Sequence, residues 1–322
     1  MNTESNAPST DTMPVAAVER MVRQLSADML TEQRSRRRWN IGLRLAWLAL
    51  VAFIVYSLSQ HANGLHTPQP GPHTALVEVR GEIAADTLAS ADNLTGALRD
   101  AFADSNSQAV VLRLNSPGGS PVQAGLVHDE ILRLKALHKK KAYAVVEESA
   151  ASGAYYIAVA ADEIYVDKAS IVGSIGVLMD GFGFTGTMDK LGVERRLITA
   201  GENKGFLDPF SPMSAGQRAY AEQMLAQIHQ QFVTVVKQGR GARLKETPET
   251  FSGLFWTGQE AVQQGLADHL GSLDYVAREV IKAENVIDYT PQENVAERLA
   301  KRFGAAMGGG AVKALRSTPS LY

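Results

Sequence analysis

The stretch around Ser152 is the part of the sequence best suited to covalent chemistry. A strand-like apolar run, Ala142–Val146, ends in two β-branched valines, small residues lead to Ser152, and an apolar helix-like run follows from Tyr155 to Ala161. A strand that turns sharply into a helix holds one hydroxyl at the helix N-terminus, where free backbone N–H groups and the positive end of the helix dipole favour a developing oxyanion. Small polar residues at this point can also form an ordinary helix cap. Two interpretations of Ser152 therefore stay open, a nucleophile and a cap.

A serine nucleophile needs a base. The chain has seven histidines, and none has an obvious acidic orienter in the sequence, so a Ser-His-Asp triad stays open without support. A lysine is the main alternative, and it must be neutral, which requires a desolvated site that lowers its pKa. Lys204 lies in a turn-rich loop with apolar residues directly after it and is the candidate. Because most lysines are solvated surface groups, a surface role for Lys204 also stays open.

Four short motifs follow one another in an order that is typical of a known family. They are Asn115-Ser-Pro-Gly-Gly119, Ala150-Ala-Ser-Gly-Ala-Tyr-Tyr156, Val172-Gly-Ser-Ile-Gly-Val177 and Ala200-Gly-Glu-Asn-Lys204. Over residues 74–285 the chain resembles the SppA/SohB-type signal peptide peptidases. These are membrane-anchored serine proteases with a Ser/Lys dyad on a ClpP/crotonase-like fold.

The resemblance implies a role for individual residues of this chain. Ser152 matches the nucleophile and Lys204 the general base of the family. Ser174 matches a serine whose hydroxyl orients the lysine. Gly119 matches the glycine whose backbone N–H helps to form the oxyanion hole, and the Gly153 N–H is a second, weaker candidate for that hole.

The chain departs from the family pattern at two points. Ala154 stands where the family usually has glycine, and Glu147 and Glu148 occupy a stretch that is often smaller or less charged. Alanine restricts φ, which is harmless if the backbone is already helical at that position. Ser152 is therefore still assigned to the sharp turn between strand and helix, which we call the elbow.

Composition excludes several classes of protein. The 322 residues allow one sizeable domain with appendages, and a net charge of −2 with a pI near 6.4 gives no sign of nucleic-acid binding. Since the chain has no cysteine, it has neither a disulfide framework nor a thiol nucleophile. No cluster of side chains has metal-ligand spacing, and we expect no metal and no cofactor.

The N-terminal sequence predicts a membrane anchor. An apolar run of 18 residues from Ile41 to Leu58 is close to the length needed to span a bilayer, and arginines 34, 36, 37 and 38 precede it. We therefore expect a cytoplasmic tail at 1–40, an uncleaved transmembrane helix at 41–60 and a Pro/Gly-rich linker at 61–74. The catalytic domain then faces the periplasm or another extracytoplasmic space, from a bacterial inner membrane as the resemblance implies.

Beyond the linker, strand-like and helix-like patterns alternate. The expected strands are 75–83, 109–114, 142–146, 164–166, 176–179 and 195–198, and the expected helices are 86–101, 122–137 and 214–238. This order predicts an α/β fold with a mostly parallel sheet, and the resemblance implies the repeated β-β-α superhelical form of the ClpP/crotonase-like core. The protease domain is expected at 75–285, and a partly mobile extension at 286–322.

The leading interpretation is a membrane-anchored serine endopeptidase. The resemblance implies that it hydrolyses cleaved signal peptides and other short hydrophobic peptides. It also implies a ring-like homo-oligomer in which Ser152 of one protomer meets Lys204 of its neighbour. Two alternatives stay open, namely a quality-control protease for misfolded envelope or membrane proteins and, in a different class, a non-proteolytic crotonase-fold membrane scaffold.

Overall fold

The computed structural model describes residue 39 and residues 42–53 and 71–291. Residues 42–53 are helical and belong to a separate unit from the body of residues 71–291, so each is described by itself. The predicted transmembrane segment, 41–60, lies partly outside the described residues, as do most of the expected tail, linker and C-terminal extension. In the part of the chain that is described, none of the helices combines the length and the apolar character needed to cross a bilayer.

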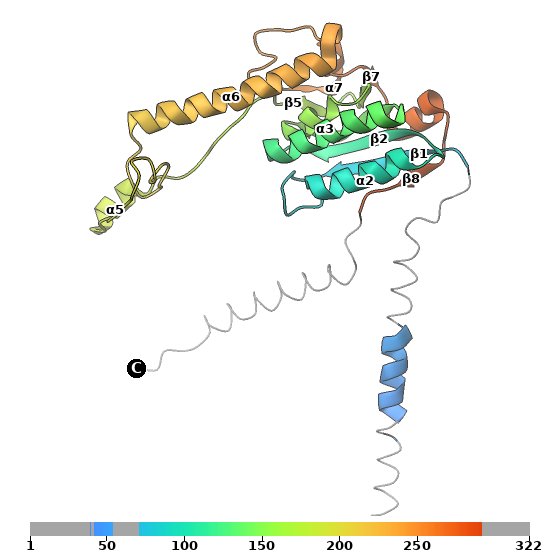
Figure 1. Ribbon diagram of the computed structural model, residues 1–322, viewed down its shortest axis with the longest axis horizontal. Helices are drawn as coiled ribbons and strands as arrows, with labels where there is room; N and C mark the ends of the chain where they lie inside the picture. Colours follow the sequence, from blue (N-terminus) through green and yellow to red (C-terminus); the bar gives the residue numbers. More distant parts are fainter. Residues whose placement is uncertain (1–38, 40–41, 54–70, 292–322) are drawn as a thin grey trace, which may run out of the picture. The chain divides into compact units, whose positions relative to one another are not determined.

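A mostly parallel β-sheet forms the centre of the body (Figure 1). Its strands are β1 His73–Arg80, β2 Ser107–Ser116, β3 Ala142–Ala151, β4 Glu163–Val166, β5 Ile171–Gly173, β6 Phe255–Thr257, β7 His269–Leu270 and β8 Val286–Asp288. The main path runs β6-β5-β3-β2-β1-β8, while β4 pairs with β3 and β7. All of these pairings are parallel except that of β5 with β6. The predicted α/β class with a mostly parallel sheet is confirmed.

Helices cover both faces of this sheet. They are α2 Ala91–Ala103, α3 Pro121–His138, α4 Gly153–Ala158, α5 Thr185–Leu191, α6 Ala215–Arg240, α7 Gly258–Gln263 and α8 Leu273–Tyr275, with a 3₁₀ turn η1 at Gly241–Arg243 and a π turn η2 at Val276–Ile281. Successive side chains of a strand point to opposite faces, so Val77 packs into the larger core under α2 to α4 and Leu76 into a smaller core under η2. Strands buried on both faces explain the nearly continuous apolar runs of β1 to β3.

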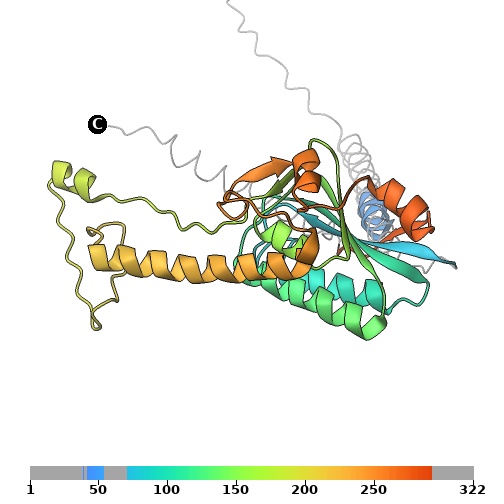
Figure 2. The same ribbon diagram turned by 90° about the horizontal axis from the view of Figure 1, so that it is seen from above.

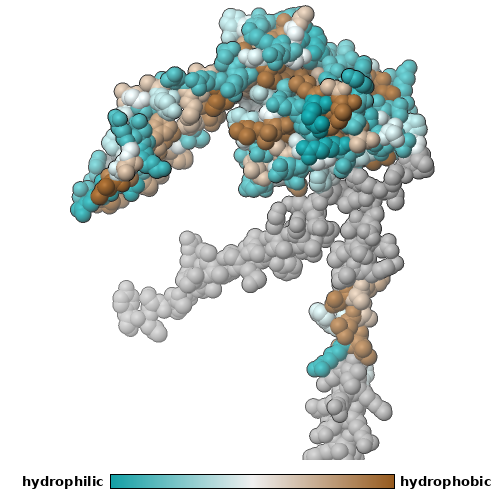
Figure 3. Space-filling view, viewed as in Figure 1, coloured by the Kyte–Doolittle hydropathy of each residue, from teal (hydrophilic) through white to brown (hydrophobic). Residues whose placement is uncertain are grey.

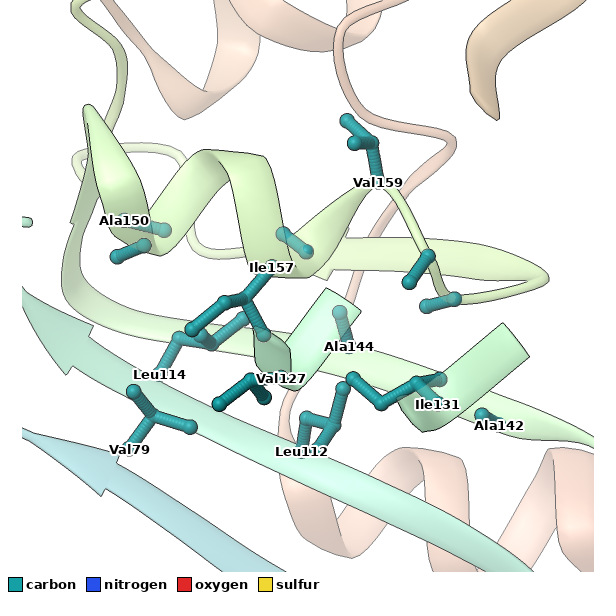
Figure 4. Packing of buried hydrophobic residues seen from close by; sticks show 14 of the residues in the cluster. Val79, Leu112, Leu114, Val127, Ile131, Ala142, Ala144, Ala150, Ile157 and Val159 are labelled. Carbon is teal, nitrogen blue, oxygen red and sulfur yellow. The ribbon is translucent and has the colours of Figure 1, made fainter. Parts of the chain in front are cut away.

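The larger core holds α3 against the middle of the sheet (Figure 4). Leu112 and Leu114 of β2 pack against Val127 and Ile131 of α3, and all four side chains are fully buried. This packing fixes the end of β2 and the start of α3 relative to the sheet. The loop between these two elements carries Gly119.

The long helix α6 leaves the body. It begins with a capping box, in which the Ser214 hydroxyl accepts a hydrogen bond from the Gln217 N–H and the Gln217 side chain accepts one from the Ser214 N–H. Its buried residues all lie in the C-terminal half: Phe232, Val233, Val236 and Arg240. Figures 1 and 2 show the N-terminal part of α6 extending beyond the sheet, together with α5. We call residues 178–227 the arm, and none of them is buried.

The C-terminal end of α6 is fixed by a buried ion pair. The Arg240 guanidinium is 1% exposed and donates to both carboxylate oxygens of Asp268, at 2.8 Å each, while its Nε donates to the Gly265 carbonyl. Burial alone would raise the pKa of Asp268, but the hydrogen bonds and charge of Arg240 hold that pKa below its ordinary value. The pair is therefore intact at neutral pH, and its contribution to stability is lost only as the pH falls through this lowered pKa.

Three expectations about the elements need correction. The sequence predicts strands at 176–179 and 195–198, and the structure has no strand at either place. Both stretches belong to the arm or to its start, where apolar side chains recur without a neighbouring strand to pair with. The structure also has a strand that was not expected: β8 pairs with β1, so the sheet continues past residue 285, the expected end of the domain.

Candidate active site

Ser152 lies at a strained turn between β3 and α4. Its backbone has φ 51° and ψ −123°, a conformation that is rare for a residue with a side chain and that recurs where a nucleophile is held above a sheet. The Ser152 N–H donates to the Gly173 carbonyl at 2.8 Å, which ties the turn to β5. Its side chain makes no capping hydrogen bond, so the cap interpretation has no support from the geometry.

Buried side chains and one hydrogen bond hold the helix that follows Ser152 in the core. Tyr155 and Ala154 are fully buried, and the Tyr155 hydroxyl donates to the Leu266 carbonyl at 2.7 Å. Ala154 lies inside α4, which runs from Gly153 to Ala158. The residue that departs from the family pattern is thus helical, and a methyl group is accommodated there without a left-handed backbone.

Two backbone N–H groups lie beside each other next to Ser152. Ile83 pairs with the backbone around Gly119: its N–H donates to the Gly118 carbonyl, and its carbonyl accepts from the Ser120 N–H. This pairing leaves the Gly119 N–H outside the ladder. The Gly153 N–H is the first of α4 and has no intrahelical acceptor. A Cβ on Gly153 would lie 3.3 Å from the Gly119 nitrogen, so both donors adjoin one point beside Ser152.

Ser174 faces the same cleft as Ser152. The cleft has a volume of about 500 Å³ and is lined by Pro117, Gly119, Pro121, Ser152, Gly153, Tyr156, Ser174, Gly176, Val177, Leu178, Ile228, Gln231, Phe232, Ser252 and Gly253. The Ser174 backbone has φ 50°, and its N–H donates to the Leu254 carbonyl at 2.8 Å. The structure therefore brings together four of the five predicted site residues, and the fifth is Lys204.

Lys204 lies outside this cleft. It is exposed, in a series of turns within the arm, and its N–H donates to the Gly201 carbonyl. None of the residues that line the cleft carries an ionisable side chain at neutral pH. His128 packs edge-on against Tyr156, and its Nδ1 is hydrogen-bonded to the Asp129 carboxylate. His128 does not line the cleft either. Within one described chain, the predicted nucleophile, Ser152, and the predicted base, Lys204, do not meet.

Most of the cleft wall could not be identified from sequence. Tyr156 of α4 and Phe232 of α6 pack with ring centroids 5.1 Å apart and form an apolar wall with Ile228. Ile228 and Phe232 are spaced as one helical face, which was the available signal, but that spacing is equally typical of core residues. Among residues 39, 42–53 and 71–291, no group of three or more His, Cys, Asp and Glu side chains is placed to hold a metal.

Replacing Gly118 by alanine tests whether the close approach of the two loops is needed. Gly118 has φ +100°, and a Cβ there would lie 2.7 Å from the Ala151 carbonyl oxygen, the Gly153 nitrogen and the Ser152 Cβ. We expect Gly118→Ala to displace the elbow and to lower kcat about a hundredfold in a peptide-cleavage assay.

Gly125→Ala is the matched control. Gly125 lies inside α3, and nothing lies within 4 Å of the position that its Cβ would take, so alanine there is expected to keep activity and to raise stability by about 0.5–1 kcal/mol. Thermal unfolding separates a displaced site from an unfolded protein. A folded Gly118→Ala protein with wild-type kcat would show that the contact between the two loops does not position Ser152.

Comparison with known proteins gives the same picture for the larger part of the body. Residues 135–287 match the model of "Peptidase family S49", a range that includes Ser152, Ser174 and Lys204 but not Gly119. Protease 4 of Haemophilus influenzae is 30% identical over 218 residues, which are 66% of this chain and 35% of that protein. An Enterococcus faecium protein with the provisional name signal peptide peptidase SppA is 29% identical over 187 residues, 58% of this chain and 54% of that protein.

A third relative carries a name of another kind. The Na(+)/H(+) antiporter NhaA of Brucella melitensis is 49% identical over 178 residues, which are 55% of this chain and 24% of that protein. The chain thus spans less than two thirds of the length of each of these three relatives. Since about three quarters of the Brucella protein lies outside the match, its name does not assign antiport to this chain.

Proposed function

We propose that this chain is a membrane-anchored serine endopeptidase, because it carries a peptidase family S49 domain of the SppA type. Its substrates are extended apolar peptides, among them cleaved signal peptides, at the extracytoplasmic face of the membrane. The observation that carries the proposal is the strained Ser152 turn beside the Gly119 and Gly153 N–H groups, in a cleft with apolar walls. The mostly parallel α/β sheet is also compatible with a ClpP/crotonase-like core.

The geometry supports acyl transfer through Ser152. The hydroxyl oxygen attacks the carbonyl carbon of the scissile peptide bond while its proton passes to the base. The carbonyl oxygen becomes an oxyanion and accepts hydrogen bonds from the Gly119 and Gly153 N–H groups, which are fixed by β2, Ile83 and α4 before the reaction begins. Collapse of the intermediate expels the amine, which takes the proton back from the base, and water then hydrolyses the acyl-serine by the same steps.

The base in this proposal is Lys204 of a neighbouring protomer. None of the side chains that line the cleft is charged at neutral pH or is a His, Lys, Asp or Glu that could act as the base, and Lys204 is carried by an exposed arm. That arm exposes large apolar side chains, including Phe182 at 82% and Ile198 at 95%, which is unfavourable unless another surface covers them (Figure 3). Seating the arm over a neighbouring cleft would bury these side chains and place the Lys204 amine in an apolar environment, which favours its neutral form. Ser174 then orients that amine.

The cleft supports the proposed substrate class. Its lining combines the apolar or aromatic side chains of Tyr156, Phe232 and Leu178 with polar ones such as Gln231 and Ser252, and Leu178 is 80% exposed. An apolar side chain next to the scissile bond gains free energy by leaving water for the apolar part of this lining. A folded protein cannot present its backbone to Ser152 between Gly119 and Ser174, so we expect extended chains to be cleaved and folded domains to be spared.

Anchoring in a bacterial inner membrane is part of the proposal. It is supported by the apolar run from Ile41 to Leu58 and by the arginines that precede it. The Brucella melitensis relative adds support. The segment that matches this chain is part of a longer protein that is named as an antiporter. An enzyme held at the membrane meets membrane-associated peptides at high local concentration.

The topology is tested by fusing a reporter that is active only outside the cytoplasm. We expect activity when the fusion point lies after residue 74 and none when it lies before residue 40, because Arg34, Arg36, Arg37 and Arg38 retain the N-terminus inside. Replacing these four arginines by glutamine should give a mixed orientation. Reporter activity from both fusion points, or from neither, would contradict a single-pass anchor with an external catalytic domain.

The peptidase activity itself is tested on the full-length protein in detergent or vesicles. An extended peptide with apolar residues around the scissile bond should be cleaved, and a stably folded protein of the same composition should not. Ser152→Ala serves as the negative control. Cleavage that is the same in this variant would assign the activity to a contaminant or to another residue.

A further inference from the structure

One hydrogen bond links helix α6 to the turn that carries Ser174. His229 of α6 places its Nε2 3.1 Å from the Ile175 carbonyl oxygen. Since a carbonyl oxygen only accepts, the Nε2 of His229 donates, in the neutral ring as well as in the protonated one. Ile175 follows Ser174 directly, and it is fully buried. A carbonyl in this position needs a donor, because a buried acceptor without one costs free energy.

His229 lies where the arm joins the body. All buried residues of α6 come after His229, and none of residues 178–227 is buried. The other end of the arm begins directly after Val177, which lines the cleft next to Gly176. The hydrogen bond from His229 to Ile175 therefore joins the two points at which the arm leaves the body.

Other contacts of the Ser174 turn come from the segment before β6. The Ser174 N–H donates to the Leu254 carbonyl, and a Cβ on Gly176 would lie 2.9 Å from the Cα of Gly253. The segment before β6 thus holds one side of the turn, while His229 holds the side toward α6. Losing the donor at His229 would leave the turn held by the segment before β6 and, at its start, by the bond from the Ser152 N–H to the Gly173 carbonyl.

We propose that His229 is a positioning residue that couples the direction of the arm to the placement of Ser174 in the cleft. The inference rests on the proposed function, in which the arm carries Lys204 to a neighbouring site and Ser174 orients the lysine that arrives. The rotation of α6 at its root and the position of the Ser174 hydroxyl then change together. A protomer whose arm is not seated therefore has a cleft whose Ser174 is less well placed.

The test compares three variants of the full-length protein. His229→Leu removes the donor and keeps an apolar side chain, and we expect kcat to fall between about ten- and a hundredfold with little change in KM. His229→Gln keeps an N–H donor at a similar reach, and we expect it to restore most of the lost kcat. Gln230→Leu is the matched control on the same helix, because Gln230 does not line the cleft, and we expect wild-type kinetics.

A second readout does not depend on catalysis. Amide hydrogen exchange of the segment from Ile175 to Leu178 should become faster in His229→Leu and return toward wild type in His229→Gln. Wild-type kcat and exchange in His229→Leu would overturn the proposal. So would equal losses in the leucine and glutamine variants, or dissociation of the assembly in His229→Leu, since these indicate a role in packing alone. If the wild type cleaves no peptide, the proposed function fails, while the exchange result still decides whether His229 holds the turn.

Discussion

Replacing Ser152 by alanine is expected to reduce peptide cleavage by at least about 10⁴-fold, with no loss of the fold. In the proposed mechanism the Ser152 hydroxyl forms the acyl bond. The Ser152 side chain makes no capping hydrogen bond, so its removal is not expected to disturb the turn. Serine already adopts φ 51° at this position, so alanine adds no backbone strain and near-wild-type stability is expected beside the loss of activity. The measurement is steady-state cleavage of an extended apolar peptide, with thermal unfolding in parallel.

Lys204→Ala is expected to be as damaging as Ser152→Ala, and the double variant no worse than either. Residues that act as one unit give losses that do not add. Ser149→Ala and Lys190→Ala are matched controls, since Ser149 lies in β3 just before the elbow and Lys190 lies on α5 in the same arm as Lys204. Near-wild-type activity of Lys204→Ala would mean that the base is another residue, with the histidines as the next candidates.

The local features of the site could be predicted because they depend on short stretches of sequence. An apolar run that is followed by small residues became β3 and the turn at Ser152, and the helix expected at 214–238 became α6. Ser174 and Gly119 were identified through the family motifs, and the structure places both beside Ser152. In each case the residues that determine the conformation are neighbours in the chain.

Long-range pairing could not be predicted in the same way. Residues 176–179 and 195–198 have strand-like composition, yet they form no strand, because β5 pairs with β6, which is about 80 residues further along the chain. The cleft wall is completed by Ile228 and Phe232 of α6, whose spacing is equally typical of an ordinary core face. Contacts of this kind depend on packing between distant segments.

The position of Lys204 illustrates the same limit. Its motif indicated a catalytic lysine, and the structure of one chain places it in an exposed arm away from the cleft. The central claim of the proposed mechanism is therefore that a second copy of the chain completes the site.

The most direct measurement of that claim mixes two inactive proteins. Ser152→Ala and Lys204→Ala protomers carry different tags, are dissociated, mixed in equal amounts and reassembled, and tandem purification selects the mixed assemblies. Where sites are shared between neighbours, one interface in four pairs an intact Ser152 with an intact Lys204, so about a quarter of the wild-type activity is expected before selection. Ser152→Ala mixed with wild type controls for reassembly and should retain about half of the wild-type activity.

The outcome separates the two arrangements of the dyad. Recovery of activity in the mixed assemblies, with none in either variant alone, is the result that the shared site predicts. Mixed assemblies that form fully and remain inactive would place Ser152 and its base within one protomer, and would contradict the proposed transfer of Lys204 between subunits.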